Sequence, residues 1–324
     1  MRPKVSVIIP FYNVEPYIGR CVESLMRQTL EEVEFIFVND GSTDGSATIA
    51  NNVIQKYLRD AVIIAHPENK GLPAARNTGL AEARGQYIYH CDSDDYLEPN
   101  ALELMYNAAI REKADFVYCD FFLDFGTHRR YMVNPDYPTP EITIKYGFLG
   151  GKMKYNVWNK LLSRDLYEKS GQRFPEGNSM GEDMTIIRLA TSATRMVHVS
   201  QALYHWMKDN EGAFSFNYSP KHLNNLQHNT QQTISYLETQ WPVGDKERFL
   251  AYFKLGIKLP FLLSGSYRQY KLWQEWFPEA NAYIRSNTIL PWRTRMVQLF
   301  AKWHLWPLVK LYSIAVTRLF YKQK

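Results

Sequence analysis

The chain has 324 residues, of which 45% are hydrophobic and 22% are charged, a mixture typical of packed globular proteins and unlike disordered or fibrous ones. Its three cysteines, Cys21, Cys91 and Cys119, are odd in number and widely spaced, which argues against a disulfide framework and a cysteine-ligated zinc site. The N-terminus leads directly into an apolar run, so we expect no signal peptide and a cytoplasmic protein.

The net charge of +5 is unevenly distributed. The residues after Glu279 include eight Lys or Arg and no acid, so the total of +5 leaves −3 for residues 1–279. Because residues 1–279 are mildly acidic and the tail is basic, we expect the tail to bind an anionic surface. We do not expect the chain as a whole to bind nucleic acid.

The first half of the chain alternates strand-like and helix-like runs. Strands are predicted at 5–10, 35–38, 61–65, 87–89 and 115–118, and helices at 16–29, 42–58 with Ser42 as N-cap, 73–83 and 99–113. Strands separated by helices of this length predict an α/β fold with a mostly parallel central sheet. Because the strands are apolar on both sides, we expect helices on both faces of the sheet.

The second half is less regular. Residues 121–155 predict loops and a hairpin, 157–169 and 183–193 predict helices, 196–199 predicts a strand before 202–206, and the chain from Pro220 onward predicts helices only. We therefore expect a first domain at 1–218 and a helical C-terminal region at 219–324. No apolar run is long enough to span a bilayer, since Leu299–Val316 is interrupted by charged and polar residues.

Polar residues follow four of the predicted strands, in the segments 10–13, 39–42, 69–77 and 92–95. In an open parallel sheet, ligands bind beyond the carboxyl ends of the strands. The pattern therefore predicts one cleft that collects a nucleobase, a diphosphate and a metal ion.

Asp92-Ser93-Asp94 is the candidate metal site, because two carboxylates one residue apart can reach the same Mg²⁺ or Mn²⁺. The alternative is a polar turn with a helix-capping aspartate, and the position after a buried strand favours the metal. Asp40–Gly45 resembles the start of a calcium loop, but Asn51 stands where that loop requires a bidentate Glu, so we reject a calcium site.

A second acidic pair, Glu182-Asp183, opens a predicted helix. One interpretation is a favourable charge at a helix N-terminus. The other is a general base that takes the proton of an attacking hydroxyl. The residues alone leave both interpretations open.

These motifs, in this order, closely resemble glycosyltransferase family 2 with its GT-A fold. The resemblance rests on Val5–Asn13, Asn39–Asp44, Asn69–Gly71 with Ala75–Gly79, and Asp92–Asp95, and it extends through Trp158-Asn159-Lys160 and Glu182-Asp183 to about residue 210. It implies that residues 1–218 are a nucleotide-sugar-binding and catalytic domain. The Gln-x-x-Arg-Trp motif of processive synthases is absent from the sequence, so the resemblance is to non-processive bacterial members.

The resemblance implies a role for each matching residue. Asp183 is the expected catalytic base with Glu182 beside it, and Asp94 the expected direct metal ligand with Asp92 nearby. The expected nucleotide-binding residues are Pro10, Tyr12, Asp40, Lys70, Arg76, Asp92 and Ser93. His205, in Tyr204-His205-Trp206, is a further candidate for the metal or a phosphate, although a lone His is more often packed or exposed on the surface.

The function expected from this resemblance is metal-dependent, inverting transfer of a hexose from a nucleotide-sugar, by family habit a UDP-sugar, to a hydroxyl of a glycan or lipid-linked acceptor. The setting would be assembly of a bacterial surface polysaccharide, with Mn²⁺ or Mg²⁺ as cofactor. The alternatives are a nucleotidyltransferase that makes a nucleotide-sugar and a non-catalytic glycan-binding module. A homo-oligomer remains open.

The tail at 291–324 carries seven Lys or Arg and is rich in aromatic residues. Its apolar residues recur at helical spacing after Pro307, at Leu308, Val309, Tyr312, Ala315, Val316, Leu319 and Phe320. Such a basic amphipathic helix is expected at an anionic membrane surface, here the inner face of the cytoplasmic membrane. The alternative is that the same stripe packs on protein.

Overall fold

The computed structural model describes residues 2–208 and 219–320. The chain divides into two compact units, one formed by residues up to 140 and 155–233, the other by 141–154 and residues from 234 onward. The division falls inside helix α8 (Pro220–Gln240). The domain boundary expected at residue 218 stays a prediction.

The first unit is built on one mixed sheet. Four parallel strands lie in the order β3 (Asp60–Ala65), β2 (Val33–Asn39), β1 (Val5–Phe11) and β4 (Tyr87–His90). The sheet continues with β8 (Lys160–Ser163), which is antiparallel to both β4 and β6 (Phe116–Asp124). β9 (Met196–Met207) pairs with β6 in parallel, whereas β5 (Tyr96–Leu97) and β7 (Arg129–Met132) are antiparallel additions to β9 and β6. The α/β prediction is confirmed, and the parallel part is the part that carries the polar loops.

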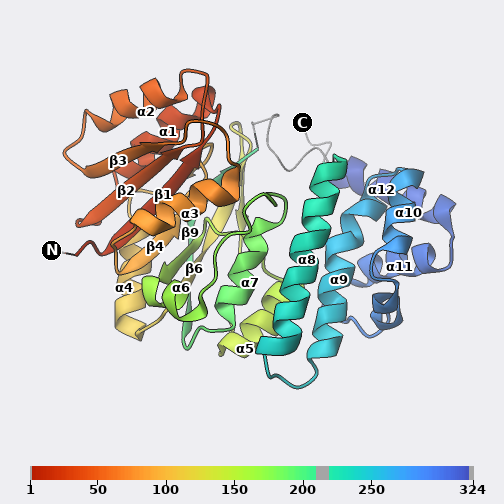
Figure 1. The fold of residues 1–324 in the computed structure, drawn as a ribbon. Coiled ribbons are helices and arrows are strands. Elements are labelled where there is room, and N and C mark those ends of the chain that lie inside the picture. The colour runs from red at the N-terminus through yellow and green to blue at the C-terminus, as the bar shows by residue number, and fades with distance from the viewer. Residues whose placement is uncertain (1, 209–218, 321–324) are drawn as a thin grey trace. The chain divides into compact units, whose positions relative to one another are not determined.

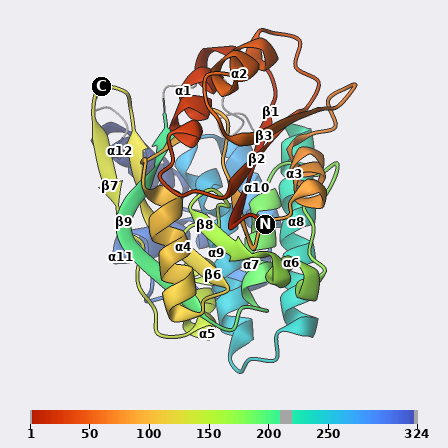
Figure 2. The same cartoon turned by 90° about the vertical axis from the view of Figure 1, so that its left-hand side faces the viewer.

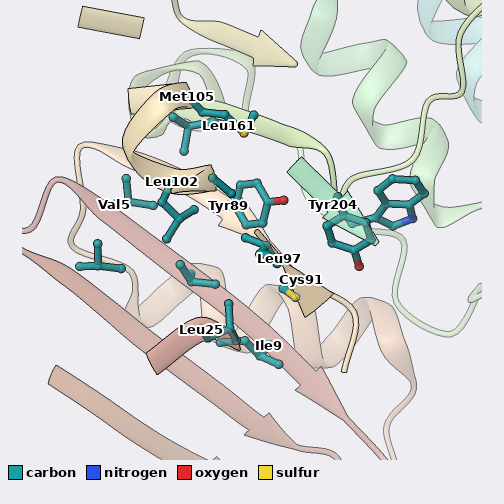
Figure 3. Close-up of a cluster of buried hydrophobic side chains, with 14 of the residues drawn as sticks. Val5, Ile9, Leu25, Tyr89, Cys91, Leu97, Leu102, Met105, Leu161 and Tyr204 are labelled. Atoms are coloured by element: carbon teal, nitrogen blue, oxygen red, sulfur yellow. The ribbon is translucent and has the colours of Figure 1, made fainter. Parts of the chain in front are cut away.

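Helices cover both faces of this sheet, which is why β1 and β2 are buried along their whole length. α1 (Glu15–Met26) and α2 (Ser46–Ile54) lie on one face, and α3 (Leu72–Glu82) packs on the other (Figure 1). Gly79 of α3 allows the close approach, since a Cβ there would lie 2.4 Å from Ile8 Cγ2. On the α1 face, Ile9, Leu25 and Leu102 meet in one hydrophobic cluster (Figure 3).

The remaining helices of this unit lie towards the β6–β9 end. α4 (Ala101–Glu112) runs beside β6 and β9 (Figure 2), and α6 (Arg164–Ser170) follows β8 directly. A 3₁₀ turn at Glu182–Met184 leads into α7 (Thr185–Ala190). This turn holds the second acidic pair.

Two sequence predictions are wrong in detail, and a third is too short. The helix predicted at 157–169 is a loop followed by β8 and α6, because Lys160, Leu161 and Leu162 pair with the strands on either side of them in the sheet. The strand predicted at 196–199 is confirmed and continues to Met207. Ser42 does not cap a helix: α2 begins at Ser46, and Ser42 Oγ accepts the N–H of Asn13 at 3.2 Å.

The second unit is helical in its described part, as the sequence predicts from Pro220 onward. It contains α5 (Pro140–Ile142, at its border), a π-helix at Thr143–Leu149, α9 (Lys246–Leu263), α10 (Tyr267–Glu275), a 3₁₀ helix at Pro278–Tyr283, α11 (Trp292–Lys302) and α12 (Trp306–Phe320). α9 lies at its centre, with α10, α11 and α12 packed against it. Among the described residues, no helix has both the length and the apolar character needed to cross a membrane.

The predicted apolar stripe of the tail only partly matches the packing of α12. Val309 and Ser313 are buried, so this side of α12 packs within the second unit, against α9 and α11. A different side is open: Leu308, Leu311 and Ile314 are 42%, 65% and 41% exposed. The side chains of Leu319 and Phe320, also predicted for the stripe, lie outside the described part.

Candidate active site

The turn after β4 presents the two aspartates of the predicted metal site. Asp95 ties this turn to β9: its buried carboxylate accepts hydrogen bonds from the Tyr204 hydroxyl at 2.6 Å and from the Met207 N–H at 2.7 Å. Burial, with the nearby Asp94 and Asp92, raises the pKa of Asp95 well above its usual value. Asp92 and Asp94 remain half-buried on the turn, whereas Ser93 between them is buried.

Arg76 of α3 is the central cation of the site. Its side chain is 2% exposed, and Nη2 lies 2.8 Å from Asp92 Oδ1 and 3.8 Å from Glu182 Oε1. Burial disfavours its charge, but Asp92, Glu182 and Asp183 outweigh burial and raise the pKa of Arg76. Nε and Nη1 are buried without a hydrogen-bond partner in the described residues. The structure thus brings Arg76 to the carboxylates, while its expected contact with the nucleotide stays a prediction.

Glu182 and Asp183 sit on the 3₁₀ turn that follows Gly181, whose φ of 84° suits glycine. Burial, followed by the charge of Asp183, raises the pKa of Glu182 well above its usual value. Burial also raises the pKa of Asp183, to about 6, against the opposing effects of Arg76 and Lys160. With a pKa of about 6, Asp183 is mostly ionised at neutral pH. Its Oδ1 is buried and has no hydrogen-bond partner in the described residues.

Asp40, at the end of β2, organises the neighbouring loop. Its carboxylate accepts the N–H groups of Lys70 at 2.9 Å and Gly71 at 2.8 Å, and lies 2.7 Å from His66 Nδ1. Gly71 adopts a φ of 91°, which an L-residue rarely adopts. Asp40 is thus 3% exposed and largely occupied by protein donors, and its expected contact with a nucleobase stays a prediction.

Three further predicted nucleotide-binding residues lie on this same edge of the sheet. Pro10 is buried near the end of β1, and Tyr12 follows it with 45% of its side chain exposed. Lys70 is exposed on the loop that Asp40 holds. The exposed ring and ammonium are available to a ligand.

The structure assigns His205 to a different network from the one expected. Its Nδ1 lies 3.1 Å from Asp124 Oδ2 and its Nε2 lies 2.9 Å from Glu98 Oε1, while its ring stacks on Tyr96 at 4.0 Å. Both ring nitrogens are occupied by carboxylates other than Asp92 and Asp94. A metal role for His205 would require one of these bonds to break, so the structure does not favour that prediction.

The sequence analysis named Trp158-Asn159-Lys160 as part of the resemblance but gave no role to the buried Lys160 or to its partners Asn156 and Asn159. Lys160 Nζ donates to the Asn156 carbonyl at 2.6 Å and to Asn159 Oδ1 at 2.8 Å. The signal in the sequence was the Trp158-Asn159-Lys160 motif, which carries a Lys inside an apolar stretch. The helix predicted at 157–169 took the place of the strand that buries the lysine.

Comparisons with known proteins agree on one family. The profile of Glycosyl transferase family 2 matches residues 6–171. The chain is 32% identical to an uncharacterized glycosyltransferase, EpsJ, of Bacillus subtilis over 82% of this chain and 79% of that protein. It is also 32% identical to a cholesterol galactosyltransferase of Borreliella burgdorferi over 71% of this chain and 67% of that protein.

Solved structures share the fold. TarS 1–349 from S. aureus, in complex with UDP, has a TM-score of 0.72 at 20% identity, covering 97% of this chain and 91% of TarS 1–349. The mannosyltransferase PcManGT from Pyrobaculum calidifontis, in complex with GDP-Man and Mn²⁺, has a TM-score of 0.57 at 17% identity, covering 100% and 89% of the two chains. The GT-A fold expected from the sequence is confirmed. With its family profile, its relatives and its fold in agreement, this chain belongs to glycosyltransferase family 2.

Proposed function

We propose that this enzyme transfers a hexose from a nucleotide-sugar to a hydroxyl of a glycan or lipid-linked acceptor, with inversion at the anomeric carbon, in the assembly of a bacterial surface polysaccharide. The observation that carries the proposal is Asp183, an ionised carboxylate with one buried, unpartnered oxygen beside the Asp92–Asp94 turn. A UDP-sugar is the proposed donor, and the complex of TarS with UDP-GlcNAc supports this choice.

In the proposed reaction, Asp183 accepts the proton of the acceptor hydroxyl as the hydroxyl oxygen bonds to the anomeric carbon. The bond from that carbon to the diphosphate breaks, and the nucleoside diphosphate leaves with its electron pair. Attack from the face opposite the leaving group gives inversion. Glu182 lies next to the base, where burial and the charge of Asp183 raise its pKa well above the usual value.

The nucleotide is proposed to lie along the edge formed by Pro10, Tyr12, the loop of Asp40 and Lys70, Arg76, and the Asp92-Ser93 segment. Tyr12 offers an exposed ring for stacking, and Lys70 an exposed ammonium for a phosphate. Asp40 acts through the backbone of residues 69–71, which it holds in place.

Mn²⁺ or Mg²⁺ is the proposed cofactor. Within residues 2–208 and 219–320, no three His, Cys, Asp or Glu side chains are grouped so as to hold a metal ion. Asp92 bonds Arg76 through Oδ1, which leaves its second oxygen to act with Asp94. A pair of carboxylates suits Mg²⁺ and Mn²⁺, which take their remaining ligands from phosphates and water. When bound, the ion would supply positive charge to the leaving diphosphate.

The test is release of nucleoside diphosphate from a panel of nucleotide-sugars in the presence of Mn²⁺ and candidate acceptors. Acceptor-dependent release of a diphosphate supports the proposal. Pyrophosphate chemistry would instead support the nucleotidyltransferase alternative, and binding without turnover would support the non-catalytic module.

We further propose that the second unit binds an anionic membrane surface, the cytoplasmic face of the membrane. Exposed apolar side chains gather in its last elements, at Trp292, Trp303, Leu305, Leu308, Leu311 and Ile314. The sequence after Glu279 has no acid, so along the chain these side chains have basic neighbours and no acidic one. Aromatic and aliphatic side chains with basic neighbours fit a lipid interface that carries negative headgroups.

The membrane proposal is tested with Leu308→Gln combined with Leu311→Gln, two exposed positions whose change leaves the buried side of α12 intact. Wild-type protein should sediment with vesicles that contain phosphatidylglycerol and not with pure phosphatidylcholine, and the double variant should sediment far less. The control is Val62→Gln combined with Val133→Gln, at exposed positions of the first unit. Equal sedimentation of all three proteins, or a dimer that only the tail variant loses, would contradict a membrane role.

A further inference from the structure

Helix α8 turns a polar face to the rest of the first unit. In the part of α8 that belongs to this unit, Asn225, Asn229 and Thr233 recur every four residues and are all buried. A helix face that packs on protein is ordinarily apolar, and a buried amide is costly unless it is hydrogen-bonded. The bonds of these three side chains therefore indicate what the face does.

Asn229 holds the loop that precedes the second acidic pair. Its Nδ2 donates to the carbonyl of Asn178 at 2.8 Å and to the carbonyl of Met180 at 2.9 Å. Two carbonyl partners require the amide nitrogen at this place, since only that end of the side chain donates. Asn229 thus fastens two residues of the loop to α8.

The segment that follows the acidic pair is attached to the same face. Arg188 of α7 donates through Nη1 to Thr233 Oγ1 at 2.7 Å. The turn itself also lies against α8, because a Cβ placed on Gly181 would lie 3.1 Å from Leu226 Cδ1 and 3.7 Å from Asn229 Cβ. Glu182 and Asp183 therefore lie between two attachments to α8.

A short path of backbone joins Asn229 to the proposed base. The Met180 carbonyl belongs to the planar peptide group that leads into Gly181, so the bond from Asn229 fixes the orientation of that plane. Gly181 has a φ of 84°, and its carbonyl accepts the Met184 N–H at 3.1 Å, which closes the 3₁₀ turn around Asp183. The direction of the Asp183 carboxylate follows from the placement of this turn.

We propose that Asn229 is a positioning residue: it fixes the backbone of residues 178–181 and so aims the carboxylate of Asp183 at the acceptor hydroxyl. The inference rests on the proposed role of Asp183 as base. An apolar side chain could fill the same space but could not set an orientation, because hydrogen bonds are directional and apolar contacts are not. A positioning role thus accounts for an amide at a fully buried position of α8.

The test compares Asn229→Leu with wild type by kcat and by the affinity for UDP in calorimetry. Leu has nearly the size of Asn and donates no hydrogen bond, so kcat should fall about 10- to 100-fold, the scale of a small misplacement of a catalytic group. UDP affinity should stay close to wild type, since the residues proposed to bind the nucleotide lie on other segments. If the Leu variant does not fold, Asn229→Ala replaces it: the freed space admits water, which satisfies the two carbonyls without fixing them, so kcat should still fall.

Asn225→Leu is the matched control. Asn225 is buried on the same face one turn earlier, and its Nδ2 donates to Asn178 Oδ1 at 3.0 Å and to the Gly177 carbonyl at 3.5 Å. These bonds end before the Met180 peptide. The control should lower the melting temperature and leave kcat close to wild type. An equal fall of kcat in the Asn225 and Asn229 variants would indicate a general loosening of the loop and would overturn the proposal.

The two proposals fail in different ways. If Asp183→Asn is inactive but the Asn229 variant keeps wild-type kcat, the positioning role is wrong and the base stands. The same conclusion follows if the Asn229 variant loses kcat and UDP affinity together. If Asp183→Asn keeps wild-type turnover, the proposed base itself is wrong.

Discussion

Replacing Asp183 by Asn should stabilise the folded protein at neutral pH while it abolishes transfer. The site raises the pKa of Asp183 from 3.8 to about 6, mainly by burial. The ionised form that the proposed reaction needs therefore lowers the free energy of unfolding. Between these two values the folded state binds more protons than the unfolded state, so stability falls as pH rises through this range. Each pKa unit is worth about 1.4 kcal/mol, so the full cost above pH 6 is about 3 kcal/mol.

Asn has the shape of the protonated Asp and lacks this cost. The variant should therefore exceed wild type by up to about 3 kcal/mol at pH 7.5, and the difference should shrink to about 0.5 kcal/mol at pH 4. With a urea m-value of about 2 kcal/mol/M, the unfolding midpoint should rise by about 1 M or more. The measurement is urea unfolding of both proteins at the two pH values.

Glu238→Gln, which neutralises an exposed carboxylate in α8, is the control and should leave the midpoint within error. An Asp183→Asn midpoint at or below that of wild type at pH 7.5 would refute the reasoning, because the buried carboxylate would then be stabilising.

Three other predictions concern the rest of the site. Arg76→Met leaves Asp92 and Glu182 without their cation and should lower the free energy of unfolding by about 3 kcal/mol, the lower end for a broken buried pair. The melting temperature should fall and recover partly at acid pH, where the carboxylates are protonated; an unchanged melting temperature would count against this prediction. Asp40→Asn replaces one of the two carboxylate oxygens that accept the Lys70 and Gly71 N–H groups. The loss of one hydrogen bond, about 1.4 kcal/mol, should weaken UDP binding about tenfold in calorimetry; wild-type affinity would contradict this prediction. EDTA and Asp94→Ala should each abolish turnover, and full activity in EDTA would contradict the proposed metal dependence.

The sequence predicted the parallel half of the sheet well because its signals are local there. Runs such as Val5–Phe11 are apolar on both faces, and each is followed by a polar loop and a helix. The same locality placed Asp92 and Asp94 on one turn after a buried strand. Asp183 and Glu182 were recognised by resemblance, and the raised pKa values that separate their proposed roles come from burial that no spacing shows.

The parts of the sheet and of the site that the sequence did not predict depend on contacts between distant segments. β8 is a short strand whose place between β4 and β6 is set by both neighbours, so its pattern alone was ambiguous. Arg76 was expected at the nucleotide, but its partners Asp92 and Glu182 come from different loops. His205 was expected at the metal, but its partners Glu98 and Asp124 also come from elsewhere in the chain.

The most direct test of the central claim is the configuration of the new glycosidic bond. Once the donor panel identifies an active nucleotide-sugar, the anomeric coupling constant of the product in proton NMR reports the configuration at the transferred carbon. With an α-linked nucleotide-sugar, attack assisted by Asp183 from the opposite face predicts a β-linked product, formed by wild type and not by Asp183→Asn. An α-linked product, or a product formed equally by the variant, would contradict the account.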